Sequence, residues 1–232
     1  MKKLYLIPTL LSENTIPQVL PPQVLTIIHG LRQFIVEDIR TARRFLSKAE
    51  HPVHIEQLQF RELNEHTPES EIVPLLPYLL DADTGFISEA GVPCIADPGA
   101  SIVRLAHANN IRVIPLVGPS SILMALMASG LNGQSFSFVG YLPVKQNERQ
   151  ERLRILERRS ASEQQTQIFI ETPYRNMQLL HDILKCCRPE TMLTIAANIT
   201  SADEFIFTQS IGQWKKKLPE LNKIPTVFLI QA

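Results

Sequence analysis

An apolar run passes directly into a loop rich in glycine and proline in the stretch Gly85-Phe-Ile-Ser-Glu-Ala-Gly-Val-Pro-Cys-Ile-Ala-Asp-Pro-Gly99. Short apolar runs of this kind are typical of buried strands in parallel sheets. The loop Ser88–Gly99 has twelve residues, which is long for a plain connection between a strand and a helix. Its small residues let the backbone approach a ligand closely, and ligands of open α/β sheets bind beyond the carboxyl ends of strands. The stretch therefore predicts an α/β fold with a ligand site at this loop.

The first half of the chain repeats the alternation of strand and helix. Strands are predicted at Leu4–Ile7, Phe34–Val36, Val53–Leu58, Gly85–Ile87 and Ile111–Leu116. Helical periodicity lies between them, at Pro22–Gly30, Ile39–Leu46, Ser70–Leu80 and Gly99–Ala108. Two prolines, Pro74 and Pro77, should shorten or kink the third of these helices. This order predicts a mainly parallel sheet covered by helices on both faces.

The second half has a different order of elements. Strands are predicted at Ser135–Tyr141, Thr166–Ile170, Met192–Ala197, Phe205–Thr208 and Pro225–Ile230, and helices at Gln146–Arg159 and Pro173–Cys186. The last three strands follow one another closely, which favours antiparallel pairing within a mixed sheet. The chain is thus predicted to be α/β in class, with two α/β domains at residues 1–117 and 118–232.

Composition and charge are those of an ordinary globular enzyme. The chain has 232 residues, of which 44% are hydrophobic and 20% charged, and its formal net charge is zero. No global positive field therefore indicates nucleic-acid binding. Basic residues do concentrate locally, with five between positions 32 and 48 and six between 145 and 159. We interpret these as solvated helix faces with paired charges, with a patch that binds a polyanion as the alternative.

Cellular location and metal content follow from the cysteines, the histidines and the apolar runs. The three cysteines have no spacing framework, no signal peptide is evident, and no apolar run approaches the ~20 residues of a membrane span. A cytoplasmic protein without a membrane partner is expected. No metal site is predicted, because the six histidines are scattered outside any recognisable ligand frame.

Two further loops follow predicted strands. Gly118-Pro-Ser-Ser-Ile122 opens a helix whose free N–H groups suit an anion, although an ordinary capped core helix is the simpler interpretation. Phe138-Val-Gly-Tyr-Leu-Pro-Val-Lys145 either faces a substrate or forms a turn at a domain edge. Within the first loop, Glu89 is placed to accept hydrogen bonds from ribose hydroxyls, and Asp97 is expected to cap the following helix.

Taken together, these blocks resemble a known family. Phe86–Gly99, Val117–Ser121, Ala128–Leu131 and Phe138–Pro143 occur in the order typical of the tetrapyrrole methylase superfamily. Within it, the chain resembles most closely the branch of small-subunit ribosomal RNA 2′-O-ribose (cytidine) methyltransferases. The matches to that branch are Val36-Glu-Asp-Ile-Arg40, Asn64-Glu-His66, Arg149 and Glu171-Thr-Pro-Tyr-Arg175. The resemblance covers nearly the whole chain.

The resemblance implies a methyltransferase that takes part in ribosomal RNA processing. It implies two α/β domains with S-adenosylmethionine, the methyl donor, in the cleft between them, commonly within a homodimer. Carried over by position, the donor contacts fall at Leu11, Glu89, Ala90, Gly91, Ile95, Ser121, Ile122, Ile170, Ala197 and Thr226. Domain 1–117 would carry the donor-binding loop, and domain 118–232 would complete the donor site.

The chain departs from the family pattern at three places, and the third of them bears on the acceptor. The loop Pro8–Asn14 lacks the usual glycine, Glu89 stands where aspartate is usual, and Ala197–Glu204 lacks the usual arginine and lysine. Three functions stay open: methylation of a ribose 2′-hydroxyl of small-subunit ribosomal RNA, methylation of a tetrapyrrole or another small molecule, and donor binding without catalysis. A 2′-hydroxyl is a poor nucleophile, so a base would assist it, and Glu37, Asp38 and Glu171 are the candidate catalytic residues.

Overall fold

The chain forms two compact units, Met1–Ser120 and Ser121–Ala232, each with its own sheet and core. The computed structural model describes residues 1–13 and 15–232, so the last residue of the loop Pro8–Asn14 lies outside the described residues. Within those ranges, no helix is both long enough and apolar enough to cross a membrane.

The first unit is built on a sheet of five parallel strands. These are β1 (Lys3–Ile7), β2 (Gln33–Val36), β3 (Gln59–Glu62), β4 (Thr84–Ile87) and β5 (Arg112–Pro115). Their order across the sheet is β3-β2-β4-β1-β5, and every neighbouring pair is parallel. The carboxyl ends of β1, β2 and β4 consequently lie side by side at one edge. The predicted mainly parallel sheet is confirmed.

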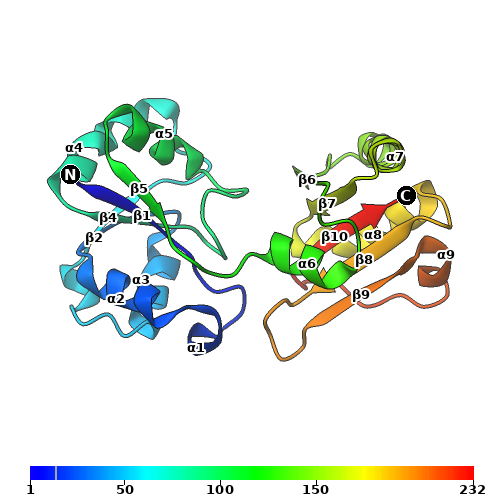
Figure 1. The fold of residues 1–232 in the computed structure, drawn as a ribbon, viewed down its shortest axis with the longest axis horizontal. Coiled ribbons are helices and arrows are strands. Elements are labelled where there is room, and N and C mark those ends of the chain that lie inside the picture. Colours follow the sequence, from blue (N-terminus) through cyan, green and yellow to red (C-terminus); the bar gives the residue numbers. More distant parts are fainter. Residues whose placement is uncertain (14) are drawn as a thin grey trace. The chain divides into compact units, whose positions relative to one another are not determined.

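Helices cover both faces of this sheet (Figure 1). Besides the short α1 (Ile16–Val19), they are α2 (Pro22–Gly30) and α3 (Ile39–Lys48) on one face, and α4 (Leu76–Asp81) and α5 (Ala100–Ala108) on the other. Strand residues alternate between the two resulting cores. Phe34 and Val36 pack with α2 and α3, whereas Ile35 between them packs with α4 and α5. Burial on both faces is why the central strands β1, β2 and β4 contain apolar runs.

The second unit has a mixed sheet. Its strands are β6 (Phe136–Tyr141), β7 (Thr166–Ile170), β8 (Met192–Ala197), β9 (Phe205–Ser210) and β10 (Thr226–Gln231), in the order β6-β7-β10-β8-β9. Only β6 and β7 pair in parallel, and the other pairs are antiparallel. The helices are α6 (Ser121–Ser129), α7 (Gln146–Glu163), α8 (Asn176–Cys186) and α9 (Ile211–Trp214). The predicted antiparallel pairing of the late strands is confirmed.

Two predicted elements of the first unit differ in the structure. Val53–Leu58 is not a strand: it holds a 3₁₀ turn at Ile55–Gln57, and its apolar side chains pack against α2 and α3 from a loop. The strand is instead β3, a mostly exposed edge strand that carries Gln59, Arg61 and Glu62 and so lacks an apolar run. The predicted helix Ser70–Leu80 is divided into two 3₁₀ turns and α4, as its two prolines require.

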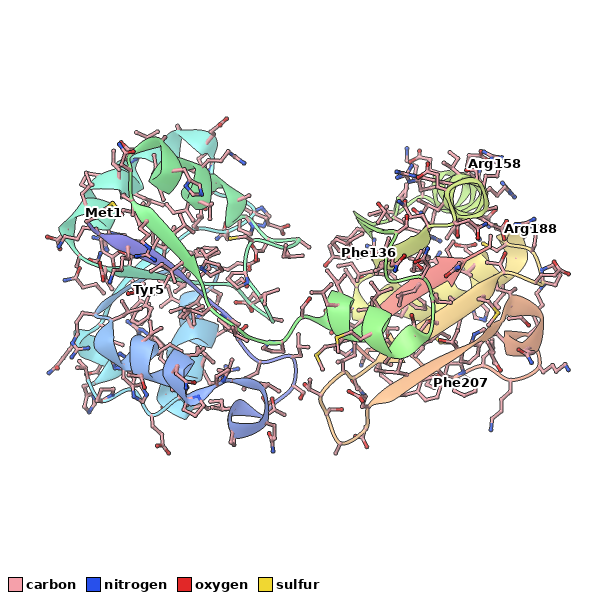
Figure 2. All side chains as sticks on the ribbon, in the orientation of Figure 1. Met1, Tyr5, Phe136, Arg158, Arg188 and Phe207 are labelled. Atoms are coloured by element: carbon pink, nitrogen blue, oxygen red, sulfur yellow. The ribbon has the colours of Figure 1, made fainter. Side chains whose placement is uncertain are left out.

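The basic helix α7 is mostly a solvated face with paired charges. Arg154 and Arg158 lie 3.4 and 3.6 Å from Glu151, and Arg159 lies 3.1 Å from Glu163. Arg158 is labelled in Figure 2, together with Arg188, which follows α8.

Arg149 is the exception on this helix. It is 1% exposed, so grouping it with the surface cations was wrong. Its guanidinium pairs with buried Asp182, and its Nη1 donates to the carbonyl of Val144 at 2.7 Å. It therefore fixes the loop after β6 from inside.

Candidate functional site

Three loops meet at the carboxyl edge of the parallel sheet. The N–H of Glu37, after β2, donates to the carbonyl of Ile87 in β4 at 3.1 Å. The N–H of Thr9, after β1, donates to the carbonyl of Gly91 at 2.9 Å. These bonds hold the ends of β1, β2 and β4 together, which is the position where open α/β sheets bind ligands.

A cavity of about 300 Å³ lies among these loops and one face of α3. This volume is at the lower end of that of small-molecule sites. The loop after β1, the helix α3 and the loop after β4 each contribute side chains to its wall. They are Thr9–Glu13, Thr41, Ala42, Arg44, Phe45, Lys48 and Ile87–Ala90.

Carboxylates gather where α3 begins, and one of them, Glu89, lines the cavity. Glu89 accepts a hydrogen bond from the hydroxyl of Thr41 at 2.5 Å, and its own N–H donates to Glu37 Oε2 at 3.2 Å. Asp38 caps α3, because its Oδ1 accepts the N–H of Thr41 at 2.8 Å. The loops after β2 and β4 thus share one network centred on Thr41.

The two acids after β2 are in different protonation environments. Burial raises the pKa of Glu37, and the N–H of Glu89 only partly offsets that effect. The N–H of Thr41 lowers the pKa of Asp38. Glu37 is therefore the better proton acceptor of the two, because its conjugate acid is the weaker acid.

The rest of the loop Ser88–Gly99 is stiffened by unusual backbone and by Asp97. Gly91, Cys94 and Ala96 have φ angles of 71°, 68° and 63°, in the left-handed region. Asp97 accepts the N–H groups of Cys94 and Gly99 at 2.7 and 2.8 Å. Asp97 therefore closes the loop on itself and does not cap α5, which begins at Ala100 after Gly99, so the expected capping role was wrong.

The predicted donor contacts of the first unit mostly come together. Leu11, Glu89 and Ala90 line the cavity. Gly91 is buried beside them, and a Cβ there would lie 3.0 Å from both Leu11 Cδ2 and the Pro119 carbonyl oxygen. Ile95 lies further along the loop and is 51% exposed.

The predicted donor contacts of the second unit lie at the start of α6 and at one end of three central strands of the mixed sheet. Ser121 and Ile122 begin α6, which packs on β8, β9 and β10. Thr226 pairs with Ala197, and the next residue of β10 pairs with Ile170. These three residues are therefore neighbours at the end of the sheet where β7 and β8 finish.

Glu171, the third candidate base, lies directly after β7. Its side chain is 1% exposed, and its Oε1 accepts hydrogen bonds from the N–H of Thr172 and from Arg175. Its Oε2 is buried without a partner among the described residues. The ion pair with Arg175 partners this buried carboxylate, which is a structural role.

The sequence analysis missed the contribution of α3 to the site. Thr41, Arg44, Phe45 and Lys48 all line the cavity, and their spacing of i, i+3, i+4 and i+7 is that of one helix face. Ser88, the first residue of the predicted ligand loop, lines the cavity, and its buried hydroxyl has no hydrogen-bond partner in the described part of the chain. The helical spacing of the four α3 residues was the sequence signal that could have identified this wall of the cavity. Metal binding receives no support from residues 1–13 and 15–232, which hold no cluster of three or more metal-ligating side chains.

Known proteins were compared with this chain by sequence. No profile of a known protein family matches it. The ribosomal RNA small subunit methyltransferase I of Vibrio cholerae is 31% identical over 205 residues, which are 88% of this chain and 67% of that protein. The chain belongs to this family. The protein of the same name from Xylella fastidiosa is 33% identical over 83% of this chain and 68% of its own length.

Solved structures show the same fold at low sequence identity. The methyltransferase CobJ has a TM-score of 0.66 and 14% identity, covering 100% of this chain and 94% of its own. Uroporphyrin III C-methyl transferase from Thermus thermophilus has a TM-score of 0.57 and 14% identity, covering 99% and 97%. The predicted α/β class and the predicted family resemblance are both confirmed, and this chain is a member of a methyltransferase family.

Proposed function

We propose that this chain is an S-adenosylmethionine-dependent methyltransferase that methylates a ribose 2′-hydroxyl of small-subunit ribosomal RNA. The observation that carries the proposal is the match over 88% of the chain to a protein named as a methyltransferase of small-subunit ribosomal RNA. A cavity beside the loop Ser88–Gly99, at the carboxyl edge of the parallel sheet, supports it.

The residues of the loop fit a methyl donor with a nucleoside part. Backbone approaches closely at Gly91, where a side chain would meet Leu11 and Pro119. Glu89 points its carboxylate at the cavity, where it suits a pair of ribose hydroxyls. When bound, S-adenosylmethionine supplies an activated methyl group. The contacts proposed for domain 1–117 are Leu11, Glu89, Ala90, Gly91 and Ile95, and those for domain 118–232 are Ser121, Ile122, Ile170, Ala197 and Thr226.

Among the three candidate bases, Glu37 suits proton removal from a 2′-hydroxyl best. Its half-buried carboxylate has a raised pKa, whereas Asp38 uses an oxygen to cap α3 and has a lowered pKa. A ribose hydroxyl that accepted the donor's methyl group would lose its proton, and Glu37 would receive that proton. Orientation by the loops supplies much of the acceleration in such a methyl transfer.

Family membership also supports a cytoplasmic location and a homodimer, as the resemblance implies.

Methylation of a tetrapyrrole or another small molecule is the second candidate function. The segment that follows β8 favours it, because residues 198–204 include Asp203 and Glu204 but no arginine or lysine. Donor binding without catalysis is the third, and it rests on the same segment and on the loop Pro8–Asn14, which lacks the usual glycine.

Ribose methylation of small-subunit ribosomal RNA, mapped in cells with and without the gene, tests the proposal. We expect one 2′-O-methyl mark to be absent from cells that lack the gene and to return with wild-type protein. Restoration by Glu37→Gln protein at full level would reject Glu37 as the base. Identical methylation maps in both strains would reject the RNA substrate and favour one of the other two functions.

A further inference from the structure

One face of α3 forms a wall of the cavity and changes character along its length. Thr41 bonds Glu89 at one end, Arg44 and the largely buried Phe45 follow one turn later, and Lys48 gives a second cation at the other end. Seven residues separate Thr41 from Lys48, which is about 10 Å along a helix. This wall therefore suits a ligand with a polar group near Thr41 and an anionic group between Arg44 and Lys48.

The cationic end of this wall is available to a ligand. Arg44 is exposed and has no ion-pair or hydrogen-bond partner among residues 1–13 and 15–232. Lys48 lies 3.8 Å from Glu13, whose side chain is 79% exposed. Exposed pairs of this kind contribute little, so Lys48 can exchange that partner for a stronger anion. Arg43, next along the helix, lies over the ring of Phe60 at 5.3 Å and does not line the cavity.

We propose that Arg44 and Lys48 hold a phosphodiester of the acceptor RNA and so direct its ribose towards the carboxylate of Glu37. This inference rests on the proposed function and names the part of the site that recognises the RNA backbone. Arginine binds phosphate in a bidentate manner and lysine acts as a point charge, so together they suit one phosphate group. The partly exposed side chain of Leu10, which lines the same cavity, gives the nucleoside an apolar contact.

A phosphodiester fits these cations better than the carboxylate of the methyl donor. The donor carries a sulfonium and an ammonium besides its carboxylate, so two cations nearby would repel the molecule as a whole. An RNA backbone carries only negative charge and gains from each cation through the release of counterions.

The test uses the variants Arg44→Ala and Lys48→Ala in the full chain, with Arg43→Ala as the matched control. The control removes the same charge from the same helix but outside the cavity. Three quantities are measured: binding to small ribosomal subunits from cells lacking the gene, the dependence of that binding on salt, and calorimetric binding of S-adenosylmethionine. Methyl transfer to the same subunits gives KM and kcat.

We expect each cavity variant to weaken subunit binding and to reduce the slope of log K against log salt by about 1. KM should rise while kcat and donor affinity stay near wild type, and Arg43→Ala should keep the wild-type slope. Wild-type slopes in both cavity variants would overturn the inference. Loss of donor affinity with unchanged subunit binding would overturn it in favour of the donor carboxylate. Subunit binding is measured whether or not methyl transfer occurs, so failure of the proposed function is seen separately.

Discussion

Glu37 combines a half-buried position with two neighbouring acids. Burial holds its pKa above the ordinary value of 4.5, and the charges of Asp97 and Glu89 act in the same direction. The folded protein therefore binds this proton more tightly than the unfolded chain. The stabilising contribution is fully present below the unfolded pKa and is lost as the pH rises through the folded pKa. At neutral pH, the ionised carboxylate consequently lowers the stability of the protein.

Glu37→Gln should therefore raise the melting temperature at pH 7, with a difference that shrinks towards pH 4. If Glu37 is also the base, turnover should fall by about 10²- to 10⁴-fold. Glu56→Gln is the control, because Glu56 is exposed and lies outside the cavity. A gain in stability that is equal at both pH values would contradict the burial argument, and unchanged turnover would contradict the role as base.

The pKa of Asp182, which forms a buried ion pair with Arg149, is shifted in the direction opposite to that of Glu37. Burial opposes ionisation of Asp182, but hydrogen bonds from Gln150, Gln146 and Arg149 outweigh it and lower the pKa. Removing Arg149 would leave the charge unpaired in the core. Arg149→Met should therefore reduce the free energy of unfolding by about 3–5 kcal/mol in urea titrations. Arg154→Met, on the surface of the same helix, should change it by less than about 1 kcal/mol. Equal losses in the two variants would refute this account.

At the scale of elements, helix α3 links stability to the site. It begins at the cap Asp38, and its first turn carries Thr41, which bonds both Asp38 and Glu89. Asp38 thus fixes the end of α3 that supports the carboxylates, and it is also one of the three candidate bases. The two roles of Asp38 are separable, because asparagine is as good a helix cap as aspartate but cannot accept a proton in this way.

Asp38→Ala should lower the free energy of unfolding by about 0.5–2 kcal/mol, whereas Asp38→Asn should keep nearly wild-type stability. With Glu37 as the base, Asp38→Asn should also keep most of the methyl transfer activity. Thermal unfolding and turnover of the two variants check this. A stable Asp38→Asn protein without activity would assign the base to Asp38.

Elements buried on both sides were predictable, and those at the edges were not. The runs of β1, β2, β4 and β7 are apolar because both faces are covered, so their position followed from composition alone. Strand β3 is a mostly exposed edge strand, and the apolar residues before it fill the core from a loop. Composition could not distinguish a buried strand from a buried loop, because apolar residues are selected by burial and not by strand geometry.

At the scale of the whole molecule, the order of loops carried more information than any single loop. The succession of Ser88–Gly99, Gly118–Ile122 and Phe138–Lys145 indicated the family, which the 31% identity to a named methyltransferase then confirmed. The cations of the cavity were not predictable, because Arg44 and Lys48 lie on a helix far from the loop in sequence. Arg149 shows a different error: a cation on a basic helix was assigned to the surface, although the structure buries it.

Calorimetric titration with S-adenosylmethionine and with its demethylated product tests most directly the central claim that Ser88–Gly99 binds the methyl donor. Wild-type protein should bind both ligands. Glu89→Ala should weaken binding by about 1.5–3 kcal/mol, which corresponds to roughly 10- to 150-fold, because a charged group then no longer accepts the ribose hydroxyls. Glu56→Ala should bind as wild type does. Donor affinity that is unchanged in Glu89→Ala, or absent from the wild-type protein, would contradict the claim.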